Sequence, residues 1–343
     1  MQPGAPGMEL RVHLEEETMA RELDEQLTKY LTDAHSIEVQ ALAQLRSAPK
    51  LAGDPQISEM FEAHLAETEG HERMTRELLE ARNASPSRVK DAVMGAGGKG
   101  FLLFARLNPD TPGKLFAHAL SYEALEFASY ELLARVAELA GEQDVAAVAS
   151  RIRTEERAMI DRLQAVVDTA FDASMRAHPR DEVEELLPKY LADAHAIEEQ
   201  AIQLLEKAPS LVEDETLAAI FHDHLAETRD HAELIEARID AVGGEGPNRL
   251  QDAVLRLGAL NWGLFFQSQP DTPGKLAAFA YAFEHLEIGG YELLKRVASK
   301  AGDGATVSVV ETILAQERGA AGRLAGSFET AVAASLRAVG VAT

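Results

Sequence analysis

The sequence of 343 residues contains no cysteine, which excludes disulfide bonds and thiolate metal sites. It also has no apolar run near the ~20 residues that a membrane-spanning helix requires. The opening residues, MQPGAPG, lack the basic and apolar regions of a secretory signal. We therefore expect a cytoplasmic protein with no membrane partner.

Basic residues are scarce. The chain has 33 lysines and arginines against 57 aspartates and glutamates, which gives a net charge of −24. Binding to nucleic acid requires a basic face, so we expect no nucleic-acid partner. The apolar fraction of 46% is ordinary for a globular protein, so the chain has enough apolar residues to bury a core.

The chain carries one unit twice, over residues 24–175 and 185–336. Short motifs recur at matching places in the two copies, namely LTDAHSIE (31–38) and LADAHAIE (191–198), HLAET (64–68 and 224–228), and PDTPGK (109–114 and 270–275). A repeat of this length indicates two domains. We expect a flexible lead at 1–18, a first domain at 19–177 and a second domain at 178–343.

Apolar residues recur with the spacing of an α-helix almost throughout the sequence. No segment shows the alternation of apolar and polar residues that is typical of a strand. The expected long helices lie near 20–47, 56–83, 111–141 and 143–175, and again near 183–207, 216–241, 272–301 and 304–337. The connection over 84–111 is long enough to travel the ~40 Å of a bundle. One long crossover is the connectivity of ferritin-like bundles. The predicted fold is all-α, with two tandem ferritin-like four-helix bundles.

Acidic residues interrupt the apolar stripe of each predicted helix at mid-length. With nearby histidines they are the candidate metal ligands: Glu38, Glu67, His71, Glu123, Glu126 and Glu156 in the first repeat, and Glu198, Glu227, His231, Glu284, Glu287 and Glu317 in the second. His64, His224, Tyr130 and Tyr291 are further candidates, as ligands or as supporting residues. Acidic residues that lie off the stripes differ between the two copies, since Glu69 corresponds to Arg229 and Glu72 to Ala232. The stripe acids are kept in both copies.

Five carboxylates that converge on one bundle centre need compensation, because burying one unpaired carboxylate already costs several kcal/mol. No arginine or lysine lies on the stripes at that level. Two divalent cations would bring four positive charges, and carboxylate with imidazole suits iron or manganese, with zinc also possible. We therefore predict two iron or manganese ions per repeat. The alternative is that the central acids face a water-filled groove.

The motif EHLEIGGY at 284–291 resembles the Glu-His-x-Glu-Ile-x-x-Tyr signature of the bacterial stress-associated ferritin-like family of the YciE/YciF type. HLAET at 224–228 and QER at 316–318 are similar to that family's motifs on the second and fourth helices. The resemblance covers nearly all of both repeats. It implies a ferritin-like fold with two bound metals and a role in stress, in a family with no settled activity.

Ferritin and rubrerythrin-like sites share this plan but differ in their histidines. Their second-helix histidine is replaced here by Gly70 and Asp230, and their fourth-helix histidine by Met159 and Ala320. The predicted site is therefore rich in carboxylate and poor in histidine. Which histidine would bind metal stays open at this point.

We expect the two bundles to pack as an intramolecular pseudo-dimer, each with a dinuclear site that oxidises Fe(II) or reduces dioxygen or peroxide during stress. The hypothesis of a dinuclear redox site implies an oxidoreductase activity. One alternative is a non-catalytic helical stress or interaction protein with vestigial sites. Another is a dimetal enzyme for an organic substrate, with a pocket lined by Phe101–Phe104 and Trp262–Phe266.

Overall fold

The computed structural model describes residues 6–85, 111–176, 183–243 and 271–341, and within these ranges all regular secondary structure is helical. The first repeat contains α1 (Pro6–Leu45), α2 (Ala48–Leu51), α3 (Pro55–Ala81), α5 (Thr111–Leu139), α6 (Gln143–Ala165) and α7 (Val167–Arg176). The second contains α8 (Val183–Leu205), η2 (Ala208–Leu211), α9 (Glu215–Ala241), α11 (Thr272–Ala301), α12 (Gly304–Gly326) and α13 (Phe328–Ala338). The prediction of an all-α tandem bundle is confirmed. Among these helices, none is long and apolar enough to cross a membrane.

Local sequence signals explain where the long helices begin and end. The Asp54 carboxylate accepts a hydrogen bond from the Gln56 amide at 2.9 Å, and Pro55 opens α3. Asp214 caps α9 in the same way. Such side chains satisfy amides that have no partner inside the helix. Gly302 ends α11 with a positive φ of 74°, a conformation that glycine adopts without steric cost.

Two boundaries differ from the sequence prediction. Helix α1 begins at Pro6, well before residue 20, because the intervening segment is rich in good helix formers. The predicted single fourth helix is two helices in each repeat, with breaks at the equivalent residues Val166 and Ser327. At each break the backbone amide of Val166 or Ser327 donates a hydrogen bond to the carbonyl three residues earlier. This bond tightens the last turn and ends the helix.

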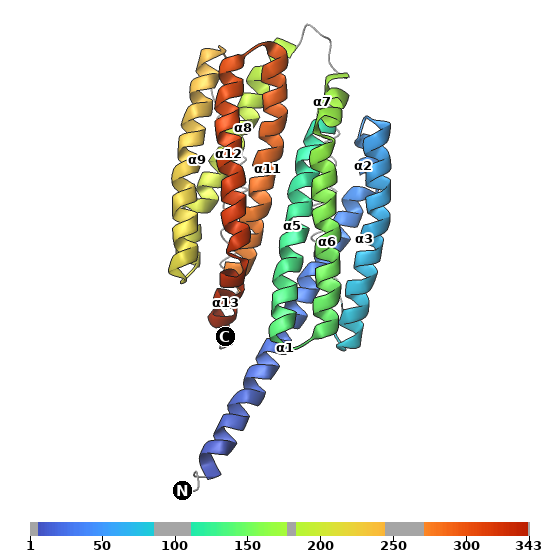
Figure 1. The fold of residues 1–343 in the computed structure, drawn as a ribbon, viewed down its shortest axis with the longest axis vertical. Helices are drawn as coiled ribbons and strands as arrows, with labels where there is room; N and C mark the ends of the chain where they lie inside the picture. The colour runs from blue at the N-terminus through green and yellow to red at the C-terminus, as the bar shows by residue number, and fades with distance from the viewer. Residues whose placement is uncertain (1–5, 86–110, 177–182, 244–270, 342–343) are drawn as a thin grey trace.

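The helices of each repeat lie side by side as a bundle (Figure 1). Helices α3 and α5 run parallel, because their N-terminal ends lie together and their C-terminal ends lie together. The Gly53 turn before α3 packs against Pro112 at the start of α5, while Arg82 after α3 pairs at 3.3 Å with Glu142 after α5. This is the arrangement that a long crossover predicts, although the crossover at 86–110 lies outside the described ranges.

The two repeats pack through their third helices, α5 and α11, which lie next to each other in the middle of Figure 1. The backbones approach closely at Gly289, where an added Cβ atom would lie 2.9 Å from the Cα atom of Ala117. Two equivalent ion pairs join each PDTPGK motif to the first long helix of the other repeat: Lys114 to Asp193 at 3.3 Å and Lys275 to Asp33 at 2.8 Å. Contacts between the repeats therefore account for several residues that the two copies share.

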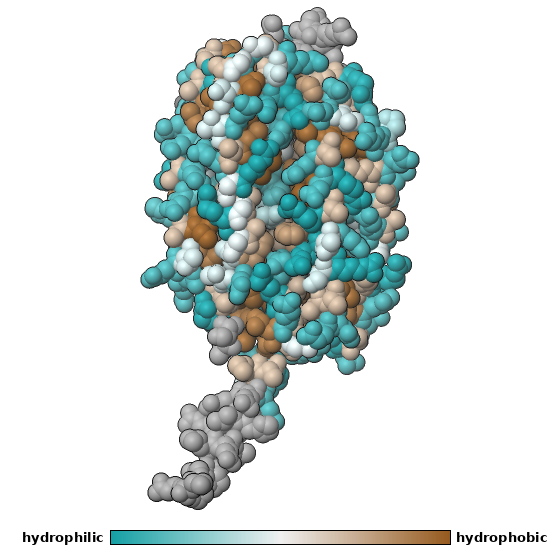
Figure 2. All heavy atoms as spheres, viewed as in Figure 1, coloured by the Kyte–Doolittle hydropathy of each residue, from teal (hydrophilic) through white to brown (hydrophobic). Residues whose placement is uncertain are grey.

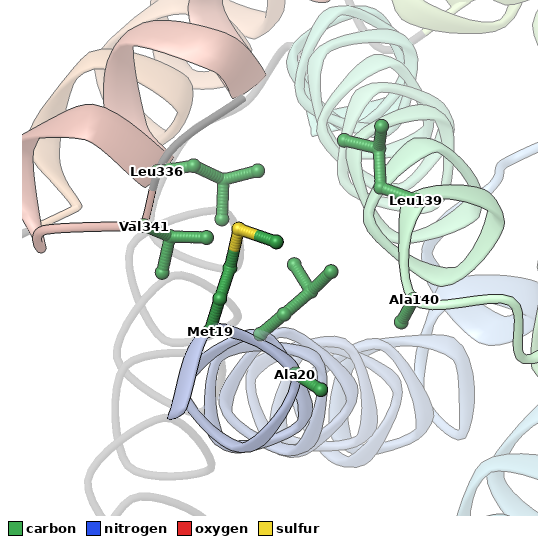
Figure 3. Close-up of a pocket in the computed structure, with 7 residues that line it drawn as sticks. Met19, Ala20, Leu139, Ala140, Leu336 and Val341 are labelled. Atoms are coloured by element: carbon green, nitrogen blue, oxygen red, sulfur yellow. The ribbon is translucent and has the colours of Figure 1, made fainter. Parts of the chain in front are cut away.

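Hydrophilic residues predominate on the face shown in Figure 2. An apolar hollow of about 260 Å³ lies where α1, α5 and α13 meet, and Met19 extends toward Leu336 and Val341 there (Figure 3). None of the candidate metal ligands lines this hollow. The aromatic segments Phe101–Phe104 and Trp262–Phe266, considered above as a substrate pocket, lie outside the described ranges.

Candidate metal centres

Four buried side chains from three helices meet inside the first bundle. They are His64 of α3, Glu123 and Glu126 of α5, and Glu156 of α6. One ligand atom from each lies within 4.8 Å of the others, and none of the four residues is more than 3% exposed. The helical stripes thus place three acids and one histidine at one level, as the sequence predicts for the acids.

A second group shares one of these acids. Glu38 of α1 and His71 of α3 join Glu156 within the same limit of 4.8 Å. The two oxygens of Glu156 face different histidines, since Oε1 lies 2.8 Å from Nδ1 of His71 and Oε2 lies 3.7 Å from Nε2 of His64. A carboxylate that belongs to two ligand groups suits a pair of ions, and bundle cores of this kind build dimetal sites from inward-facing acids and histidines.

The second bundle repeats both groups with equivalent residues. His224, Glu284, Glu287 and Glu317 form the first group, and Glu198, His231 and Glu317 form the second. Nε2 of His224 lies 2.7 Å from Glu284, and Nδ1 of His231 lies 2.7 Å from Glu317. Glu317 is therefore the shared acid. Twelve of the sixteen predicted site residues are thus brought together in these four groups.

The acids of these groups are buried with little compensation from protein. Among the described residues, neither oxygen of Glu126 has a hydrogen-bond partner, and the same holds for Glu287. The ion pairs that Glu38, Glu123 and Glu156 make in the described ranges involve histidines alone. Unpaired buried carboxylates are costly, so this donor set fits a bound cation.

His64 gives a further test of fit. Its Nδ1 donates to Glu67 at 2.9 Å, which leaves Nε2 as the atom that faces the centre. Nε2 lies only 2.9 Å from an oxygen of Glu123. A nitrogen lone pair and a carboxylate oxygen repel at that distance unless a proton or a cation lies near both. The atoms that face inward are therefore those that a divalent cation requires.

Burial and mutual repulsion raise the pKa values of three acids in the first centre. Burial, and next the charge of Glu156, raises the pKa of Glu38 to about 8. Burial raises the pKa of Glu123 to about 7, with partial relief from His64. Burial, and next the charge of Glu156, raises the pKa of Glu126 well above 4.5.

The pKa of the shared acid shifts downward, whereas the pKa of the histidine beside it shifts upward. Burial acts to raise the pKa of Glu156, but the hydrogen bond with His71 and the histidine charges lower it overall. Burial likewise acts to lower the pKa of His71, yet its bond to Glu156 and the nearby carboxylates raise it to about 9. Without a cation, protons on the histidines and acids balance the buried charge.

The predicted tyrosines support the centres from outside the ligand groups. Tyr130 donates a 2.5 Å hydrogen bond to Oε1 of Glu38, and Tyr291 donates to the equivalent Glu198. Both tyrosines are buried. Each hydroxyl bonds to one carboxylate oxygen, and the other oxygen has no hydrogen-bond partner in the part of the chain that the structure describes.

Glu67 and Glu227 are not brought into the ligand groups. The Glu67 side chain is 35% exposed and accepts a 2.7 Å hydrogen bond from Arg162. The hydrogen bond from His64, and next the pair with Arg162, holds the pKa of Glu67 near 2. Glu227 pairs with Arg323 in the same way. The expectation that all five acids lack a basic partner is wrong for these two, because they lie at the edge of their stripes, within reach of the fourth helix.

Two pairs of functional residues were missed by the sequence reasoning. Arg162 and Arg323 stand at equivalent positions, so the comparison of the two copies contains their signal. The second pair is Glu155 and Gln316, which bond to His71 and His231 from the surface side. Helical periodicity does not identify this pair, because it shows which residues face the core and not which residues reach the outer nitrogen of a buried histidine.

Comparison with protein families finds one match in each repeat. The family model described as "Domain of unknown function (DUF892)" matches residues 22–176 and again residues 182–337. Each match contains one complete pair of ligand groups. No solved structure matches the chain.

Proposed function

We propose that this chain, which belongs to the DUF892 family through both of its repeats, binds two iron or manganese ions in each repeat and uses them for redox chemistry on Fe(II), dioxygen or peroxide. The observation that carries the proposal is the buried acid shared by two ligand groups, Glu156 in one repeat and Glu317 in the other. The likeness of its motifs to the YciE/YciF type of ferritin-like protein supports a role in stress. We take domains at 19–177 and 178–343, paired within one cytoplasmic chain, as part of this proposal.

The charge of the buried groups favours two divalent ions in each repeat. Four fully buried acids line the first centre, namely Glu38, Glu123, Glu126 and Glu156. Their four negative charges equal the four positive charges of two divalent cations. Glu67 does not enter this balance, because Arg162 already neutralises it.

The proposed ligands differ at one point from the set expected from sequence. His64 takes the inner position, and Glu67 holds it there by accepting from its Nδ1. His71 is held in the same manner by Glu155, which accepts from Nε2 so that Nδ1 faces the centre. Partners of this kind fix the ring orientation and the tautomer of a metal-binding histidine.

Bound iron or manganese would supply the one-electron chemistry. The residues of the chain would bind the ions, orient them and exclude water. Glu123, Glu126 and Glu156 are almost completely buried, so the fold would keep bulk water away from the centre. Tyr130 restrains Glu38 through its hydroxyl hydrogen bond.

Stopped-flow absorbance after mixing metal-free protein with Fe(II) and oxidant tests this proposal. We expect oxidation faster than in buffer, and the double variant Glu126→Ala/Glu287→Ala to fall to the buffer rate, since Glu126 is in one ligand group and Glu287 in its equivalent. The matched control is Glu77→Ala, because Glu77 is exposed and the second repeat already carries Ala237 there. If the wild-type rate equals the buffer rate, the redox proposal is wrong, and the hypothesis of a non-catalytic stress or interaction protein replaces it.

A further inference from the structure

We propose that the two centres are unequal, and that the first repeat holds divalent cations more tightly than the second because Glu155 stands where the second repeat has Gln316. This inference rests on the proposed function, since it concerns the affinity of the same centres. It would make the first repeat fill before the second when the cation is scarce.

The observation is a pair of equivalent hydrogen bonds with different acceptors. Nε2 of His71 lies 2.7 Å from a carboxylate oxygen of Glu155. Nε2 of His231 lies 3.0 Å from the amide oxygen of Gln316. In both rings the other nitrogen, Nδ1, faces the shared acid of the centre. The two histidines are therefore held in the same orientation by groups of different charge.

The acceptor affects the cation through the imidazole ring. A carboxylate that accepts from Nε2–H draws the proton toward itself and makes Nδ1 a stronger electron donor. A neutral amide does this less, because it carries no full charge. Loss of such an outer partner usually weakens metal binding by about 10- to 100-fold. The charge of the carboxylate also attracts a divalent cation directly.

Arg151 could offset this difference, since it pairs with Glu155 at 2.9 Å and the second repeat has Thr312 in its place. Its side chain is 65% exposed, so solvent screens its charge. It also bonds to Oε1, whereas His71 bonds to Oε2. The carboxylate thus keeps a full acceptor for the histidine.

Another difference near the centre is Tyr122, which corresponds to Phe283 in the second repeat. Its hydroxyl donates to the backbone carbonyl of Ile37 at 3.0 Å, so that bond does not involve a candidate ligand. Glu155 is bonded to a candidate ligand, and this favours it as the residue that separates the two affinities.

Equilibrium titration with Mn²⁺, following free Mn²⁺ by electron paramagnetic resonance, tests the inference. The wild-type chain should show a tight and a weaker class, which Glu126→Ala and Glu287→Ala assign to the first and second repeat. Glu155→Gln should weaken the tight class by about 10-fold or more, and Gln316→Glu should strengthen the weaker class by a similar factor. Arg151→Thr is the matched control, because it keeps the carboxylate and should leave the tight class tight.

The outcomes separate this inference from the proposed function. If both repeats bind Mn²⁺ with one affinity, or if neither exchange of acceptor moves its class, the inference is overturned while the metal centres stand. If the wild-type chain binds neither Mn²⁺ nor Fe²⁺, the proposed function fails and the inference fails with it. A gain of affinity in Gln316→Glu supports the inference, because misfolding would weaken metal binding and not strengthen it. Circular dichroism melting identifies a Glu155→Gln protein that has lost its fold.

Discussion

The stability of the metal-free protein should fall as pH rises from about 5 to 9, a range set by the shifted acids and histidines. Each raised carboxyl keeps its proton in the folded state at a pH where the unfolded chain has released it. The folded state then loses stability as pH passes from the unfolded pKa to the folded one. The pKa of Glu38 rises from 4.5 to about 8, and Glu198 and Glu284 also reach about 8.

The histidines act in the same direction. His71 and His224 have folded pKa values raised from 6.5 to about 9, chiefly through neighbouring carboxylates that outweigh their burial. Their contribution to stability is present below about pH 6.5 and is lost as pH rises through about 9. One pKa unit corresponds to ~1.4 kcal/mol. The shift of Glu38 alone is therefore worth on the order of 5 kcal/mol as an upper bound, and shifts within one centre do not add because the groups are coupled.

Thermal melts of metal-free and Mn²⁺-loaded protein across this pH range measure the effect. The gap between the two melting temperatures should widen as pH rises, because the cation replaces the lost protons. Glu126→Gln removes a buried carboxylate whose oxygens have no hydrogen-bond partner within the described ranges, so it should stabilise the metal-free protein at pH 8 and flatten its pH dependence. A gap that stays constant with pH would refute the account of buried, mutually repelling acids.

Three further outcomes are expected. Loading with Mn²⁺ at neutral pH should release protons, because cations displace those held on acids of raised pKa; calorimetry in buffers of different ionisation enthalpy counts them, and a count of zero contradicts the reasoning. Glu126→Ala should empty the first repeat and Glu287→Ala the second, so metal content halves in each case; loss of all metal in either variant would mean that ligands are shared between repeats. Gly289→Ala should destabilise the fold by ~1–3 kcal/mol in denaturant titrations, because its Cβ meets the backbone of Ala117, whereas Gly322→Ala faces open space and should be neutral or stabilising.

The sequence predicted most of the fold, because helix periods and end signals are local. The helix predicted near 56–83 begins at Pro55 in the structure, directly after its cap Asp54. The long connection between the second and third helices predicted their parallel course, which the matched helix ends confirm. The break of the fourth helix was missed, since Val166 is an ordinary apolar residue with no breaker signal.

The candidate centres were predicted from acids at core positions, and the structure gathers all of these acids except Glu67 and Glu227. Periodicity separates a core face from a surface face, but it does not resolve residues at the edge between them. Glu67 lies on that edge, where Arg162 reaches it. The choice among histidines depended on ring orientation, which hydrogen bonds to Glu67 and Glu155 determine. Such bonds join distant residues and leave no periodic pattern.

The metal content of the purified chain, measured by native mass spectrometry after loading with Mn²⁺ and removal of excess ion, tests the central claim most directly. The shared acids Glu156 and Glu317 make the sharpest comparison, because each belongs to both ligand groups of its repeat. We predict about four ions in the wild-type chain, two per repeat as in dinuclear bundle sites, and about two in Glu156→Ala. A wild-type chain that holds no more metal than Glu156→Ala/Glu317→Ala would contradict the account.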